Sequence, residues 1–238
     1  MAIVREPAPR NLAGNYEFKP GRYSSHSLML AALPAEGRGR RVLDLGCGTG
    51  DISRLLSQRG FEVTSVDRPC LDRPRLPETV QFIEADLDRG LPALLEPPFD
   101  YIICGDVLEH LKDPGATLAS LAAALAPGGR LVASLPNSGN LYFRLNILMG
   151  RFPAHDRGLF DRTHLHFYMW SGWKALFEEA GLQIETVRPT AVPFSLACPA
   201  MKRTAQAAES LYSLLARAWK KLFAYQFVVA ARRRQEDP

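Results

Sequence analysis

The segment Val-Leu-Asp-Leu-Gly-Cys-Gly-Thr-Gly at residues 42–50 constrains the fold more than any other part of the chain. An apolar run at 41–45 predicts a buried strand, and the glycines after it predict a tight turn into a helix over 51–59. Glycines at such a turn allow positive φ angles and let the backbone approach a ligand closely. Asp67 ends the next predicted strand, 21 residues after Gly46, where an acid suits the hydroxyls of a ribose.

The turn differs from two common phosphate-binding loops. Its glycines are spaced G-x-G-x-G, and Asp51 stands where a dinucleotide-binding loop has its third glycine. An acid at the start of a helix favours a cationic or neutral ligand over a pyrophosphate. No Gly-Lys-Ser/Thr ending is present, which excludes a P-loop. A tight turn without a ligand is the alternative, but strand, turn, helix and distal acid occur together and favour a binding site.

The rest of the chain alternates between strand-like and helix-like segments. Apolar and β-branched runs predict strands at 41–45, 61–66, 80–84, 99–104, 130–135, 182–187 and 224–231. Helix patterns lie at 25–33, at 113–125 before Pro127-Gly128-Gly129, and from Ser171 to Gly181. The chain has 238 residues and is 47% hydrophobic, enough for one large core. This alternation predicts an α/β, doubly wound sheet, with an irregular crossover at 67–79 because that segment holds three prolines.

Four motifs in order make the chain resemble the class I S-adenosylmethionine-dependent methyltransferases. They are the glycine turn, Asp67 with Arg68, the Ala-Asp-Leu at 85–87, and the segment Phe-Asp-Tyr-Ile-Ile-Cys-Gly-Asp-Val-Leu-Glu-His at 99–110. The resemblance implies a Rossmann-like seven-stranded sheet, order 3-2-1-4-5-7-6 with the last strand antiparallel, and helices on both faces. It also implies S-adenosyl-L-methionine as cofactor, contacted by Asp44, Gly46, Cys47, Gly48, Asp67, Arg68, Asp86, Leu87, Gly105 and Asp106.

We expect a single domain over 1–238, divided by the role of each part. Residues 1–40 form a leader, 41–137 the cofactor-binding core, 138–168 a cap inserted after the fifth strand, and 169–238 the remainder of the sheet with an amphipathic helix. In related folds such a leader lies over the cofactor, so Tyr23 is a candidate lid residue. A surface tail is the alternative for the leader.

The cap is the segment expected to choose the acceptor, because loops at the carboxyl ends of strands carry specificity in doubly wound folds. It interleaves four arginines with aromatic residues and loosely resembles bacterial methyltransferases associated with glycans, lipids and secondary metabolites. We expect methyl transfer to oxygen on a small-molecule, glycan or lipid-linked acceptor. Methylation of nitrogen or carbon is the alternative, and a non-catalytic cofactor-binding regulator is the rival from another class.

Three histidines lie where a general base is expected. A hydroxyl acceptor must lose its proton, and an imidazole with a pKa near neutrality can accept it. The candidates are His110, His164 and His166, with Asp161 placed to orient His164. The alternative is that this run only packs, with Asp161 and Arg162 as a local ion pair. No metal is expected.

The charge and the segment 201–222 bear on partners. The net charge of +4, with no appended RNA-binding module, makes a nucleic-acid partner unlikely. In 201–222, Leu211, Leu214 and Leu215 share a helical stripe that we expect to pack on the sheet; peripheral contact with an anionic membrane is the alternative. The four cysteines form no C-x-x-C pair, and no signal peptide or membrane span is evident, so we expect a cytoplasmic protein, with a peripheral position at the inner membrane face as the alternative. The oligomeric state is left open.

Overall fold

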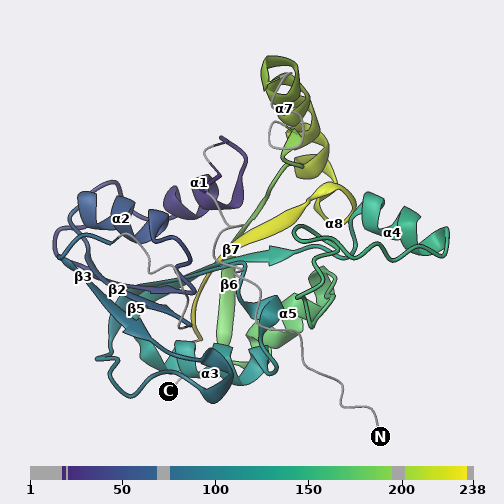
Figure 1. Cartoon of the computed structure of the whole chain (residues 1–238). Coiled ribbons are helices and arrows are strands. Elements are labelled where there is room, and N and C mark those ends of the chain that lie inside the picture. Colours follow the sequence, from purple (N-terminus) through teal and green to yellow (C-terminus); the bar gives the residue numbers. More distant parts are fainter. Residues whose placement is uncertain (1–17, 20, 69–75, 195–201, 235–238) are drawn as a thin grey trace, which may run out of the picture.

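A single mixed sheet of seven strands organises the chain (Figure 1). The computed structural model describes residues 18–19, 21–68, 76–194 and 202–234. The strand order is β3-β2-β1-β4-β5-β7-β6, in which β7 is antiparallel to both of its neighbours. The predicted topology is therefore confirmed. The strands are β1 (Arg41–Leu45), β2 (Glu62–Asp67), β3 (Val80–Glu84), β4 (Phe99–Gly105), β5 (Leu125–Pro136), β6 (Leu182–Pro189) and β7 (Gln226–Arg233).

Helices cover both faces of the sheet, because successive strand residues point to opposite sides. Helices α1 (Ser25–Leu30) and α2 (Asp51–Gln58) bury Met29 and Leu56 against one face. Helices α3 (Pro114–Ala124) and α5 (Trp170–Glu179) bury Leu118 and Trp173 against the other. The shorter or outlying elements are η2 (Leu87–Arg89), η3 (Leu108–His110), α4 (Leu141–Leu148), α7 (Lys202–Ala218) and α8 (Lys220–Phe223).

The fifth strand begins earlier than its sequence pattern predicts. We expected a turn at Pro127-Gly128-Gly129, but β5 starts at Leu125, directly after α3. The three residues lie in an irregular stretch, where the register with β4 shifts. Gly129 packs so closely that an added Cβ would lie 2.9 Å from the carbonyl oxygen of Phe99. Because Gly129 has no side chain, the strand can continue through a stretch whose proline and glycines predict a turn. In the predicted irregular crossover, residues 69–75 lie outside the described residues.

The leucine stripe of 201–222 does not pack on the sheet, so that expectation was wrong. Helix α7 stands away from the sheet (Figure 1), and Leu211, Leu214 and Leu215 are 66%, 58% and 46% exposed. Its buried face instead carries small or polar residues, including Ala205, Glu209, Ser213 and Ala216. Small residues allow close approach to the body of the protein, which leaves the leucines on the outside. Within the described residues, every helix is too short or too polar to cross a bilayer.

Candidate functional site

The glycine turn at the carboxyl end of β1 is held tightly against the neighbouring strands. Gly46 has φ +71°, and an added Cβ would lie 2.3 Å from Cγ2 of Val107. The backbone amides of Gly46 and Cys47 both donate to the carbonyl of Val66 at the end of β2. A side chain at position 46 is therefore excluded by both backbone conformation and space.

Asp67 closes this turn from the end of β2. Its carboxylate accepts a hydrogen bond from the amide of Gly48 at 2.6 Å and another from the amide of Arg68 at 2.7 Å. These two contacts fix the carboxylate at the mouth of the turn, where the resemblance places a ribose. The Arg68 side chain is exposed.

Asp44 is a buried carboxylate directly beneath the turn. Burial raises its pKa to about 6, and the hydrogen bond from the Ser53 hydroxyl, 2.5 Å long, opposes that rise. Ser65 in turn donates to Ser53 at 2.8 Å, so a short chain of hydroxyls orients the carboxylate. A cation bound nearby would favour the ionised form of Asp44.

The other cofactor-side candidates have different surroundings. Asp86 caps η2 by accepting from the amide of Asp88 and forms an ion pair with Arg89 at 3.5 Å. Leu87 is buried in the main core. Tyr23 lies by α7, where a hydrogen bond from Ser213 lowers its pKa. The leader therefore places Tyr23 against α7.

Asp106 joins the leader to the carboxyl ends of β4 and β5. It adopts φ +55°, unusual for a residue other than glycine, and this often marks a functional position. Its carboxylate accepts from Lys19 at 3.0 Å, from Ser134 at 2.5 Å and from Gln226 at 2.8 Å. Burial alone would raise its pKa, but Lys19 and the Ser134 hydrogen bond hold the pKa well below the usual value.

A second polar cluster lies beside Asp106 and contains Glu109, His110 and His164. Two backbone hydrogen bonds bring its parts together, because the amides of Leu165 and His166 both donate to the carbonyl of Glu109. The imidazole rings of His110 and His164 lie 4.8 Å apart, edge to face. Glu109 is 1% exposed, and its Oε1 lies 3.8 Å from Nε2 of His164.

The protonation states in this cluster follow from burial. Burial lowers the pKa of His164 to about 4, and the nearby His110 lowers it further. Burial likewise lowers the pKa of His110 and raises that of Glu109 well above its usual value. Both imidazoles are thus neutral at pH 7, and each keeps one nitrogen lone pair. The pKa of His164 nevertheless lies well below the near-neutral value expected of a general base.

The neighbours of His110 settle which of its nitrogens is free. Its Nδ1 lies 3.1 Å from the carbonyl oxygen of Thr163 and therefore donates to it. The hydroxyl of Thr163 donates to Asp161 at 2.6 Å and lies 3.0 Å from the same Nδ1. Asp161 and Thr163 consequently hold the ring of His110 with the lone pair on Nε2.

His166 differs from the other two histidines. Its Nε2 donates to the carbonyl oxygen of Leu111 at 2.9 Å, and its Nδ1 lies 3.4 Å from the hydroxyl of Tyr168. The ring also stacks on Tyr168. Both nitrogens are thus engaged, and the Nε2 contact anchors the end of the cap to the segment after η3.

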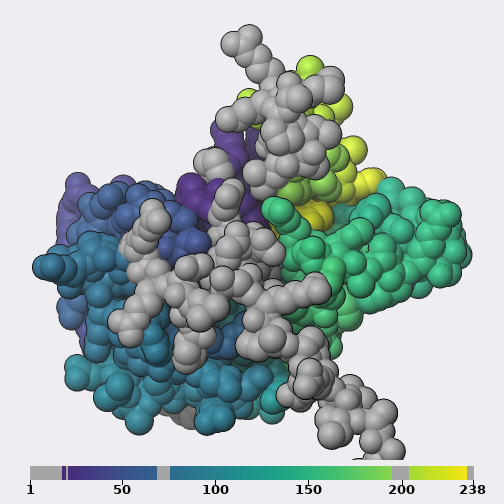
Figure 2. Space-filling view, viewed as in Figure 1, coloured from purple at the N-terminus to yellow at the C-terminus, as the bar shows by residue number. Residues whose placement is uncertain are grey.

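The cap (138–168) forms a projection at one side of the molecule (Figure 2). Its interior is aromatic, with Phe143 stacked on Phe160 at 4.4 Å between centroids and Phe152 packed edge-on against Phe160. Asn137 and Asn140 tie its first residues to the carbonyl of Ala224 at the base of β7. The cap is therefore fastened at both ends, at the sheet edge and at Glu109.

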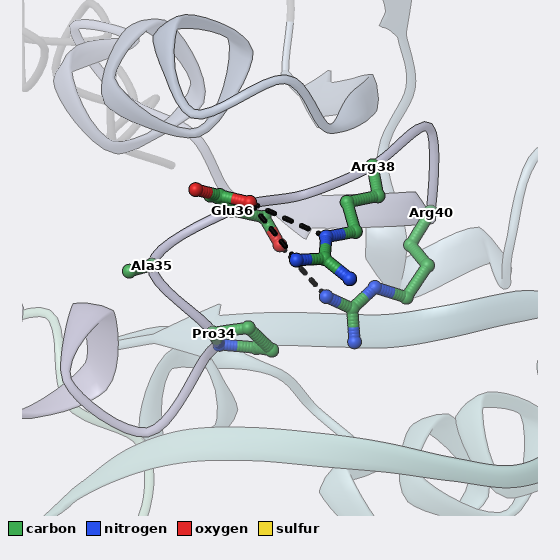
Figure 3. A pocket seen from close by; sticks show the side chains of 5 residues that line it. All are labelled: Pro34, Ala35, Glu36, Arg38 and Arg40. Carbon is green, nitrogen blue, oxygen red and sulfur yellow. Dashed lines mark hydrogen bonds and ion pairs between the residues drawn. The ribbon is translucent and has the colours of Figure 1, made fainter.

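A pocket of about 310 Å³ lies at the opposite end of the sheet, before β1 (Figure 3). Glu36, Arg38 and Arg40 line it, together with Pro34 and Ala35. The carboxylate of Glu36 accepts from Arg38, and Arg40 donates to the backbone carbonyls of Glu36 and Gly37. Its charged groups are thus satisfied by one another or by the local backbone, and the glycine turn lies at the other end of β1. The pocket is therefore assigned no role.

Four residues of this region were not expected from the sequence. Lys19, Ser134 and Gln226 surround Asp106, and Glu109 completes the histidine cluster. Ser134 could have been found, because β4 and β5 are neighbouring parallel strands whose carboxyl ends meet. Lys19 carries no signal, since it lies 87 positions from Asp106 in a segment without a strong pattern.

Comparisons with known proteins agree with this architecture. A family model described as a methyltransferase domain matches residues 18–187. A ubiquinone biosynthesis O-methyltransferase of Xylella fastidiosa (strain 9a5c) is 36% identical over 157 residues, which are 63% of each chain. One from Xanthomonas axonopodis pv. citri (strain 306) is 34% identical over 160 residues, 64% of this chain and 66% of its own.

A solved structure adds to the comparison of folds. An S-adenosylmethionine-dependent methyltransferase from Mesorhizobium loti aligns with a TM-score of 0.60 and 22% identity. The alignment covers 88% of this chain and 98% of the other. This likeness shows the fold. The chain itself spans about 63% of the length of the Xylella relative.

Proposed function

Because the chain belongs to this family of S-adenosylmethionine-dependent methyltransferases, we propose that it transfers the methyl group to an oxygen atom of a small hydroxylated acceptor. The observation that carries the proposal is the pair of neutral imidazoles, His110 and His164, between the cap and the loop after β4. Lone pairs at this place can draw the proton from a hydroxyl. The names of the curated relatives, which are O-methyltransferases of ubiquinone biosynthesis, also support oxygen as the acceptor atom.

The cofactor side of the proposal assigns a role to each carboxylate. Asp67, fixed by two amides, accepts from the ribose hydroxyls. Asp44, whose pKa of about 6 reflects burial without a cation, faces the positively charged end of the cofactor. The remaining cofactor contacts expected from the sequence stay proposals; they are Tyr23, Gly46, Cys47, Gly48, Arg68, Asp86, Leu87, Gly105 and Asp106.

The reaction is a displacement at the methyl carbon. The bond between the acceptor oxygen and the methyl carbon forms as the carbon–sulfur bond breaks, and its electron pair stays on sulfur as S-adenosylhomocysteine. The acceptor's proton leaves through the cluster of Glu109, His110 and His164. Holding two bound reactants in line can supply about 7–11 kcal/mol of the barrier reduction. The cap and the glycine turn provide that orientation.

The outer surface suits a small hydroxylated acceptor that is carried on a lipid and presented at an anionic membrane surface. Asn140, at the start of α4, reaches the hydroxyl of Tyr212 in α7 at 3.4 Å, so the two helices share one end of the molecule. Large apolar side chains are exposed there at Leu145, Ile147, Leu148, Met149, Phe152, Leu211, Leu214, Leu215 and Trp219. Exposed basic residues accompany them at Arg144, Arg151, Arg157, Arg217, Lys220 and Lys221. Apolar residues bordered by basic ones suit an anionic lipid surface.

Vesicle sedimentation tests the lipid contact. We expect the protein to sediment with vesicles containing an anionic phospholipid, and less with neutral vesicles. Leu148→Ser, at a side chain that is 83% exposed, should weaken sedimentation. Leu94→Ser is the control, since Leu94 is 72% exposed but lies in the loop before β4. Equal loss in both variants, or equal binding to both vesicle types, would reject the contact.

Methyl-labelled cofactor tests the transfer. The protein is incubated with labelled cofactor and fractionated extract, and the labelled product is analysed for the atom that carries the methyl group. His164→Ala should abolish turnover while cofactor affinity stays nearly unchanged; His155→Ala, at an exposed histidine of the same cap, should retain activity. Label on nitrogen or carbon contradicts O-methylation. Tight cofactor binding without product in any fraction favours a regulatory protein.

A further inference from the structure

Glu109, His110 and His164 have the composition and spacing of a metal site. Each residue offers one ligand atom, and these atoms all lie within 4.8 Å of one another. Glu109 and His110 both lie in η3, which follows β4, whereas His164 comes from the cap, 54 positions after His110. The backbone hydrogen bonds from Leu165 and His166 to Glu109 hold these two segments together.

The cluster also contains polar atoms with no partner. Three buried side-chain atoms in the described part of the chain lack a hydrogen-bond partner, and two of them are Oε2 of Glu109 and Nδ1 of His164. A buried polar atom without a partner costs about 1–3 kcal/mol. The contact between the two side chains joins Oε1 of Glu109 and Nε2 of His164, 3.8 Å apart, so it leaves the other two atoms without a partner. A bound cation would compensate the burial of these polar groups.

We propose that Glu109, His110 and His164 bind a divalent transition-metal ion such as Zn²⁺. Two imidazoles and one carboxylate are the ligand set of zinc sites that keep a position open for substrate or water. Ligand atoms about 2.1 Å from a tetrahedral ion lie about 3.4 Å apart. The present spacing of up to 4.8 Å therefore closes by small side-chain rotations when the ion enters.

The surroundings of His110 match those of a metal-binding histidine. Ligating histidines usually donate their second nitrogen to a carbonyl or carboxylate, which fixes the tautomer. Nδ1 of His110 makes this contact with the carbonyl of Thr163, and the Thr163 hydroxyl connects it to Asp161. Nε2 of His110, which keeps its lone pair, is therefore the atom that would bind the ion. Asp161 and Thr163 are thus positioning residues in this site.

The ion's chemical role rests on the proposed function. The acceptor hydroxyl would occupy the open position, where the ion lowers the pKa of the hydroxyl and its proton leaves to solvent. The resulting oxygen anion forms the bond to the methyl carbon as the carbon–sulfur bond breaks. The products are the methyl ether, S-adenosylhomocysteine and the released proton. The imidazoles then act as ligands, and the ion replaces them in activating the hydroxyl.

Zinc titration of the full chain, without a histidine tag and after chelator treatment, tests the site directly. Calorimetry with ZnCl₂ should show one ion per chain. Glu109→Gln and His164→Ala should weaken binding by about 100-fold or more, since even outer partners of metal ligands contribute roughly 10- to 100-fold. His155→Ala, which removes an exposed histidine, should bind like the wild type.

Thr163→Val provides the second variant, because it keeps a similar shape and removes only the hydroxyl next to His110. We expect its zinc affinity to fall by about 10- to 100-fold. The inference is overturned if the wild type does not bind zinc. It is also overturned if His155→Ala weakens zinc binding as much as His164→Ala does. The titration uses neither cofactor nor acceptor, so zinc binding without any O-methyl product would refute the proposed function and leave the metal site standing.

Discussion

Gly46→Ala is predicted to destabilise the chain because position 46 excludes a side chain in two independent ways. Its φ of +71° costs an alanine about 1–2 kcal/mol. The new Cβ would also lie 2.3 Å from Cγ2 of Val107, far inside the usual contact of about 3.5–4.0 Å. Overpacking of this kind costs about 1–3 kcal/mol more, giving a total of about 2–5 kcal/mol.

Gly48→Ala is the matched control in the same turn. Its φ is +54°, but an added Cβ would meet nothing within 4 Å. We therefore expect only the conformational cost of about 1–2 kcal/mol. Urea unfolding of the cofactor-free chain, followed by circular dichroism, gives both free energies. The double variant Gly46→Ala/Val107→Ala should lose about 1–3 kcal/mol less unfolding free energy than the two single variants lose together. Equal destabilisation by the two glycine variants, with additivity in the double variant, would refute the reasoning.

Two further predictions concern buried carboxylates. The pKa of Asp44 rises from 3.8 to about 6 on folding, so its stabilising contribution is present below about pH 4 and is lost as the pH rises through 6. The wild type should therefore lose about 2 kcal/mol of unfolding free energy relative to Asp44→Asn between pH 4 and pH 7. Parallel urea-unfolding profiles of the two proteins would contradict this. Lys19→Met leaves the largely buried carboxylate of Asp106 without its cation and should lower the free energy of unfolding by about 1–3 kcal/mol, measured by thermal unfolding. Arg54→Met, at the more exposed ion pair with Asp51, should lower it by about 1 kcal/mol or less. Similar costs for the two variants would mean that the Lys19 contact is no stronger than a surface pair.

The strand pattern could be predicted closely because both faces of most strands are buried. Strands β1 and β3 have the bounds expected from their runs of apolar residues. Helix α4 could not be predicted, because its sequence LYFRLNIL has no single apolar face and its leucines are 37% to 83% exposed. The orientation of α7 was likewise missed, since periodicity identifies an apolar face but not whether that face is covered.

The cofactor side of the candidate site was easier to foresee than the acceptor side. Asp44 and the glycine turn belong to one continuous segment, and Asp67 ends the next strand along the chain. Their positions in the sequence were therefore enough to predict that they lie together. The contact between Glu109 and the cap depends on how a segment of about 30 residues folds back, and local propensity does not specify that path. The histidines were recognised by residue type, but their partners required the structure.

The two hydrogen bonds from Leu165 and His166 to the carbonyl of Glu109 have a consequence for redesign. They divide the cap into a part that can be exchanged and a part that cannot. A chimera that replaces residues 141–158 with the corresponding loop of another enzyme would keep the attachment at Glu109. Replacement of 159–168 would detach the insertion from the loop after β4. New acceptor preferences should therefore be sought by grafting at the α4 end of the cap.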